Sequence, residues 1–163
     1  MINTYSKAIE LYINLVYKVI IFFMFVLIIT VGLQIAGRYI FFIPRYLWTI
    51  EISNFCLIWL IFLGSIIGVK ERKHFYIDIF YNMKLKPLYE DFFKFTYYFV
   101  LISISMVFIV FGYRFFQNGL LQTSEVTELN LGLIHISVPF TGISWLLILL
   151  NEILGKRFGK NEY

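Results

Sequence analysis

Charged residues are scarce in this chain and are missing altogether from four long stretches. Asp, Glu, Lys and Arg make up 15% of the 163 residues, whereas hydrophobic residues make up 60%. A soluble fold of this length has nowhere to place so much apolar surface. The uncharged stretches are also long enough to cross the ~30 Å hydrocarbon layer as helices, and they lack the alternation of barrel strands. The sequence therefore predicts an all-α membrane protein with four transmembrane helices, at about residues 19–37, 52–69, 95–113 and 131–151.

Cysteine and the motifs of catalysis are equally scarce. The single cysteine, Cys56, lies inside the second predicted span, so the chain has no internal disulfide. No serine or threonine stands in a Gly-x-Ser-x-Gly elbow, no glycine-rich phosphate loop occurs, and no cluster of Cys, His, Asp and Glu has metal-ligand spacing. We therefore expect no catalytic, substrate-binding or metal-binding residue and no cofactor here. Without an internal repeat, residues 1–163 are expected to form one four-helix domain.

The basic residues that are present follow the order of the spans. If the N-terminus is inside, the cytoplasmic segments hold eleven of the fourteen Lys and Arg residues, and only Arg38, Arg45 and Arg114 lie outside. Short cytoplasmic loops are enriched in Lys and Arg, so this distribution predicts that both termini are cytoplasmic. The net charge of +4 is then a signal of topology, and nothing in it suggests binding to nucleic acid.

Three segments outside the spans have recognisable patterns. Residues 1–18 are expected to be a short interfacial helix that merges into the first span, because Ile9, Tyr12, Ile13 and Val16 recur at helical spacing. Residues 38–51 are rich in aromatic side chains around Pro44 and are expected to make a tight outer hairpin. Residues 74–86 have one apolar and one polar helical stripe, which predicts an amphipathic helix lying on the cytoplasmic leaflet.

Two kinds of ionisable residue allow functional alternatives. Glu51 stands at the outer edge of the second span, where Arg38 is placed to pair with it; the alternative is a proton- or cation-coupled carrier that uses Glu51. His74 and His135 suggest a haem-binding redox subunit, but they are expected near opposite membrane surfaces, whereas two haem ligands must face one iron. Structural roles are therefore favoured for Glu51 and for both histidines.

Small and polar residues inside the spans indicate helix packing. Gly64-xxx-Gly68 in the second span permits close approach of a neighbouring helix. Polar side chains form a short face on the first span and a longer one on the fourth, and Pro139 is expected to kink the fourth span. These polar residues are Thr30, Gln34, Ser137, Thr141, Ser144 and Asn151.

Four short motifs occur in order along the first half of the chain. They are Gly37-Arg38-Tyr39-Ile40-Phe41, Trp48-x-x-Glu51, Trp59-Leu60-x-Phe62-Leu63-Gly64 and His74-x-x-x-Asp78. This order resembles the DctQ-like small integral membrane subunit of tripartite ATP-independent periplasmic (TRAP) transporters. Length and four-span layout agree along essentially the whole chain. One departure is Thr49-Ile50-Glu51, where family members often have a second acidic residue before the glutamate.

The resemblance implies a subunit of the bacterial inner membrane that has no transport site of its own. A large membrane partner would carry sodium-coupled, elevator-type transport of an organic anion, such as a C4-dicarboxylate or a sialic acid, delivered by a periplasmic binding protein. Sodium would bind that partner. The small subunit would brace the scaffold among the membrane lipids, and the binding protein would reach only loops 38–51 and 114–130.

The same resemblance indicates structural roles for eight residues. Arg38, Trp48 and Glu51 are expected to fix the outer hairpin. Helix packing is expected of Trp59, Gly64 and Gly68, while His74 and Asp78 are expected to order the cytoplasmic helix.

Overall fold

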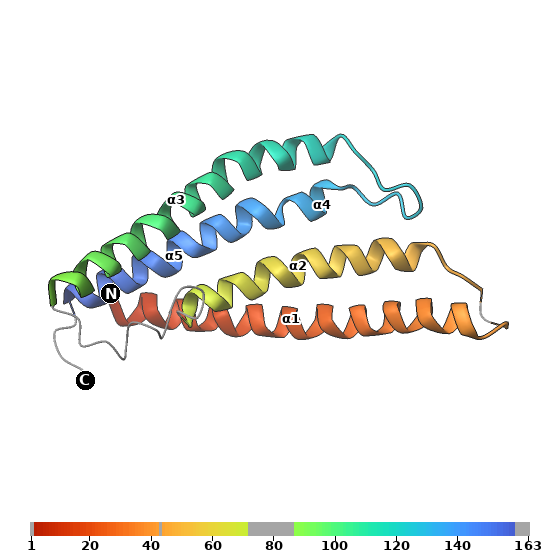
Figure 1. Ribbon diagram of the computed structural model, residues 1–163, viewed down its shortest axis with the longest axis horizontal. Helices are drawn as coiled ribbons and strands as arrows, with labels where there is room; N and C mark the ends of the chain where they lie inside the picture. Colours follow the sequence, from red (N-terminus) through yellow and green to blue (C-terminus); the bar gives the residue numbers. More distant parts are fainter. Residues whose placement is uncertain (1, 43, 72–86, 159–163) are drawn as a thin grey trace.

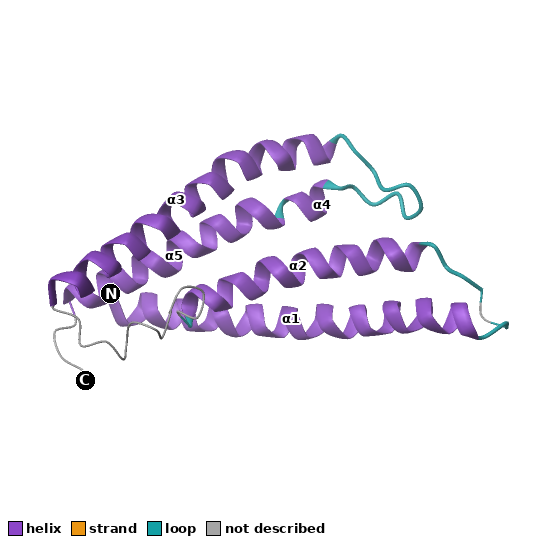
Figure 2. Ribbon diagram, viewed as in Figure 1, coloured by secondary structure: helices purple, strands orange, loops and turns teal. Residues whose placement is uncertain are grey.

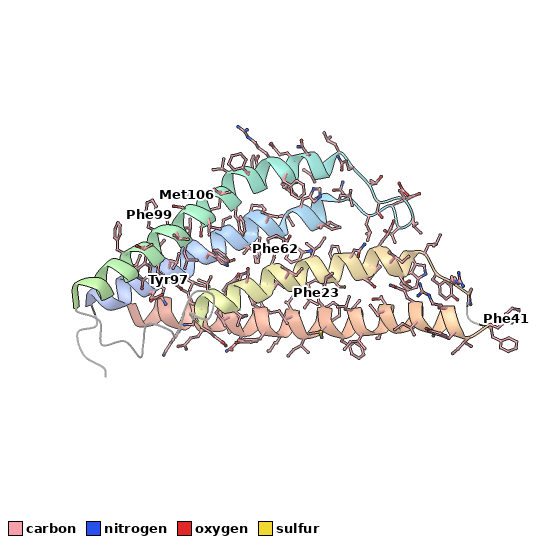
Figure 3. All side chains as sticks on the ribbon, viewed as in Figure 1. Phe23, Phe41, Phe62, Tyr97, Phe99 and Met106 are labelled. Atoms are coloured by element: carbon pink, nitrogen blue, oxygen red, sulfur yellow. The ribbon has the colours of Figure 1, made fainter. Side chains whose placement is uncertain are left out.

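The computed structural model describes residues 2–42, 44–71 and 87–158, and these residues are almost entirely helical (Figures 1 and 2). They form α1 (Ile2–Tyr39), α2 (Trp48–Lys70), α3 (Pro87–Leu120), α4 (Gly132–His135) and α5 (Ser137–Phe158). The described part contains no strand, and its one β-bridge joins Thr123 to Asn130. The predicted interfacial helix at 74–86, with His74 and Asp78, lies outside the described residues.

Among the described residues, four helical segments are long and apolar enough to cross a bilayer, as predicted. They are Lys7–Tyr39, Trp48–Lys70, Phe95–Leu120 and Gly132–Ile153, the last of which contains α4 and most of α5. Each of these segments covers the span predicted from the sequence, to within a residue at the start of the fourth. The all-α, four-span prediction is therefore confirmed.

The long helices form a single layer in the order α1, α2, α5, α3, with α1 and α3 at its edges (Figure 1). We call the end of the layer that carries residues 40–47 and 121–131 the loop end, and the end that carries the N-terminus the terminal end. The α1–α2 pair and the α3–α5 pair diverge toward the loop end (Figure 1). Many large apolar side chains on the faces of this layer are exposed. Near the terminal end, however, α1 also contacts α5, and α2 also meets α3.

The main apolar core lies where the two pairs converge. Its buried members come from all four long helices and include Leu63, Ile66, Leu101, Trp145 and Leu149. Phe62 of α2 meets the ring of Phe108 on α3 at a centroid distance of 6.2 Å. Packed side chains thus hold the two helix pairs together at the terminal end. At the loop end, where the pairs diverge, other contacts must join them.

Residues 2–18 lead straight into the first span, as expected, but their apolar stripe does not lie at the membrane interface. They continue without a break into α1, a single helix of 38 residues and roughly 57 Å. Ile9, Ile13 and Val16 are buried in the core, while Lys7 and Lys18 are exposed on the same helix. The apolar stripe was correctly identified, but it packs against protein, so the segment extends the first span.

The fourth span is interrupted near Pro139, as expected. α4 ends at His135 and α5 begins at Ser137. Proline has no N–H to donate to the carbonyl four residues earlier, and its ring crowds that carbonyl, which here belongs to His135. The helical hydrogen bonds resume with the N–H of Phe140, which donates to the carbonyl of Ile136 at 3.1 Å.

Candidate functional site at the loop end

Glu51 lies in the first turn of α2 and binds the loop between α3 and α4. The backbone N–H groups of Val126 and Thr127 donate to its carboxylate at 3.0 and 2.8 Å, and the Thr127 hydroxyl donates at 2.6 Å. Hydrogen bonds to an ionised acceptor are stronger than neutral ones. The carboxylate therefore ties the α1–α2 pair to the α3–α5 pair where the two diverge.

The loop that Glu51 holds, residues 121–131, has a defined backbone conformation of its own. The N–H of Ser124 donates to the carbonyl of Leu129 at 2.9 Å, and the N–H of Leu131 donates to that of Gln122 at 3.0 Å. Glu128 adopts a left-handed conformation with φ of 54°. The loop thus presents its amides to Glu51 from a folded hairpin.

Asn130 joins this loop to the helices on either side. Its side-chain amide donates to the carbonyl of Leu120 at the end of α3, and its side-chain oxygen accepts the N–H of Gly132 at the start of α4, at 2.9 and 2.8 Å. Both ends of the loop are therefore anchored to the helices by contacts that do not involve Glu51.

Arg38 is not the partner of Glu51. Within the described ranges the two residues form no ion pair, and Arg38 lies exposed at the end of α1. The expectation placed the two residues at matching ends of neighbouring helices, but the loop amides occupy the carboxylate. Trp48 is partly exposed beside Tyr46, with ring centroids 6.0 Å apart.

A polar network inside the membrane-spanning region joins α1 to α2. The side-chain amide of Gln34 donates to the carbonyl of Thr49 and to the hydroxyl of Ser53, at 3.0 and 2.8 Å. Ser53 donates in turn to the hydroxyl of Thr30 at 2.8 Å. The polar face of the first span was predicted, but its partners Thr49 and Ser53 were missed. The spacing of four residues between Thr49 and Ser53, which puts both on one face of α2, was the available signal.

Trp59 links α2 to both of its neighbours, as its packing role predicted. Its indole N–H donates to the carbonyl of Leu133 in α4 at 3.0 Å. Its ring lies 6.1 Å from Phe23 of α1 and 6.1 Å from Phe140 of α5, measured between centroids. This side chain therefore spans the junction of the two helix pairs.

Gly64 makes no close helix contact inside the described part of the chain, so a packing role there would have to involve a partner. A Cβ atom placed on Gly64 would meet nothing within 4 Å, because the residue faces out of the layer, while Gly68 is half-buried. Close approach occurs instead between α3 and α5. A Cβ on Gly142 would lie 2.9 Å from the carbonyl oxygen of Ser105, and one on Gly112 would lie 2.9 Å from the ring of Pro139.

The polar face of α5 is buried and locally bonded. Ser137 and Thr141 have no exposed surface, and their hydroxyls donate to backbone carbonyls one turn earlier in the chain. The Ser144 hydroxyl lies 2.7 Å from the hydroxyl of Tyr12 on α1. The face thus serves helix contacts, as predicted.

His135 stacks on Phe115 with a centroid separation of 3.7 Å, and its Nδ1 lies 3.1 Å from the carbonyl oxygen of the same residue. In the parts of the chain that the structure covers, no three His, Cys, Asp or Glu side chains gather where a metal ion could bind.

Fold and site together define a small multi-pass membrane protein whose polar groups serve mainly to hold its own helices together. Residues 27–158 match the family model of the DctQ component of tripartite ATP-independent periplasmic transporters. The chain belongs to the DctQ family, and it is a multi-pass protein of the bacterial inner membrane.

A relative in Haemophilus influenzae is named as a TRAP transporter small permease protein. It is 27% identical over 110 residues, which cover 68% of this chain and 68% of the relative. The resemblance inferred from the four motifs is thereby confirmed, and the chain is a small permease subunit of a TRAP transporter.

Proposed function

We propose that this chain is the fixed scaffold subunit of a sodium-coupled TRAP transporter. In this proposal a large elevator-type subunit moves an organic anion, such as a C4-dicarboxylate or a sialic acid, that a periplasmic binding protein delivers. The observation that carries the proposal is the single layer of helices, with apolar side chains exposed along it. Such a layer offers a long lateral surface to a membrane partner. Once bound, it would help keep the scaffold of that partner from tilting in the bilayer.

The interior polar groups support the same role. Thr30, Gln34, Thr49 and Ser53 bond to one another, and Tyr12 bonds to Ser144 on a different helix. A transport path needs polar or ionisable groups that are available to the substrate. These groups are instead engaged in fixing helix positions, which suits a subunit that stays still while its partner moves.

The orientation that we propose places the loop end in the periplasm. Residues 40–47 and 121–131 then face the binding protein, and both termini lie in the cytoplasm, in agreement with the distribution of Lys and Arg. Glu51 serves in this arrangement as the residue that sets the position of the 121–131 loop.

Uptake measurements in cells test the scaffold role. Cells that lack this chain, but contain the large subunit and the binding protein, should take up no substrate, and the full-length chain supplied from a plasmid should restore uptake. Tagged chain should also co-purify with the large subunit in mild detergent. Full uptake without this chain, or uptake by this chain alone, would overturn the proposal.

A further inference from the structure

An apolar groove of about 620 Å³ runs along α1 and α2 and reaches the loop end at Trp48, Val126 and Thr127. Its walls are Phe22, Phe25, Val26, Ile29 and Thr30 of α1 with Trp48 and Ile52 of α2, and Val126 and Thr127 bound it on the side of the 121–131 loop. The α1 wall runs from Phe22 to Thr30, a rise of roughly 12 Å along the helix. We propose that this groove binds one acyl chain of a phospholipid from the leaflet at the loop end.

The surroundings of the groove favour a lipid chain. All its helical walls belong to segments that span the membrane, and Phe22, Phe25 and Ile29 are largely exposed there. Water would find few hydrogen-bond partners in an apolar groove. An acyl chain would make dispersion contacts with the groove walls and leave no void. The medium beside these spans is itself made of acyl chains.

The held loop gives the groove a fixed boundary. Val126 and Thr127 line it, and their amides are the groups that donate to Glu51. A wall that is anchored by three hydrogen bonds retains its shape when a chain enters or leaves. The groove is therefore a formed site, which distinguishes its occupant from lipids that exchange freely along the other faces.

Charge at the loop end matches the headgroup that such a chain would bring. Arg45 precedes Trp48, a residue of the groove, by three positions. It is exposed, and across the described ranges it forms no ion pair with an acidic residue. A guanidinium group binds phosphate well, so Arg45 is placed to contact the phosphate of a phospholipid whose chain lies in the groove.

Native mass spectrometry of the full-length protein tests this binding. The protein is stripped of lipid in detergent and reloaded with phosphatidylglycerol, and we expect about one lipid per chain to be retained in this groove. Val26→Trp fills the floor of the groove and should lower retention several-fold. Ile28→Trp, an equally large change at an exposed position outside the groove, should leave retention unchanged.

A second pair of variants tests the headgroup without changing any packed residue. Arg45→Gln should weaken phosphatidylglycerol retention, and Arg114→Gln, which removes an exposed cation from α3, should not. The inference would be overturned if Val26→Trp retained as much lipid as the wild type, or if the two tryptophan variants lost lipid equally. Equal effects of the two arginine changes on retention would also overturn it. The groove lies within this one chain, so the result is independent of whether uptake requires the subunit.

Discussion

The stability of the α3–α5 contact should depend on the absence of a side chain at Gly142. A Cβ atom there would lie 2.9 Å from the carbonyl oxygen of Ser105, 2.9 Å from the Cβ of Phe108 and 3.0 Å from the Cγ1 of Ile109. The first of these atoms is backbone and the second is fixed to it, so α3 and α5 must move apart by several tenths of an ångström. Overpacking of this kind costs about 1–3 kcal/mol, and we expect Gly142→Ala to lower the free energy of unfolding by that amount.

Gly64→Ala is the matched control, because a Cβ on Gly64 meets nothing within 4 Å. The same added methyl group should leave stability unchanged or raise it by up to about 1 kcal/mol, through the better helix propensity of alanine. Unfolding of the purified full-length variants by sodium dodecyl sulfate, followed by circular dichroism, measures both changes. Equal stability of Gly142→Ala and Gly64→Ala would refute the close approach of α3 and α5.

Three further predictions concern the loop end and the exposed face. Glu51→Gln should speed hydrogen exchange of the amides in the 121–131 loop, whereas Glu125→Gln, at an exposed carboxylate of the same loop, should not; equal exchange in both variants would contradict the Glu51 contact. Trp59→Phe removes one hydrogen bond to α4 and should cost about 0.6–1.7 kcal/mol in the same detergent titration, and an unchanged transition would contradict that bond. Gly64→Leu should leave the isolated subunit folded but reduce co-purification with the large subunit if the partner covers that face; full recovery would show that it does not.

The four spans were predictable because the bilayer excludes charge, and runs without charge are visible in any sequence. The start of the first span was harder to place. Residues 1–18 were expected at the membrane interface, yet Ile9 and Ile13 are buried in the core, while Lys7, Glu10 and Lys18 lie on the exposed side of the same helix. Charge count along the chain does not reveal which face of a helix carries the charge.

The partner of Glu51 was not predictable, because it lies 75 and 76 residues away in the sequence. Which helices come together at the loop end depends on the packing of the whole layer. The close contacts of glycine within the chain were not predictable for a related reason. Gly64-xxx-Gly68 matches a known packing motif, but Gly142 makes the close contact without one. The spacing of small residues does not show which side of a helix faces its neighbour.

The position of α5 has a consequence for how the chain is assembled as it leaves the ribosome. α5 follows the other described helices in the chain, yet it lies between α2 and α3. α1 and α2 are neighbours in both sequence and space, so they can pair as soon as both are inserted. α3 packs mainly against α5 and α4. We therefore expect α3 to reach its final packing only after α4 and α5 have followed it into the bilayer.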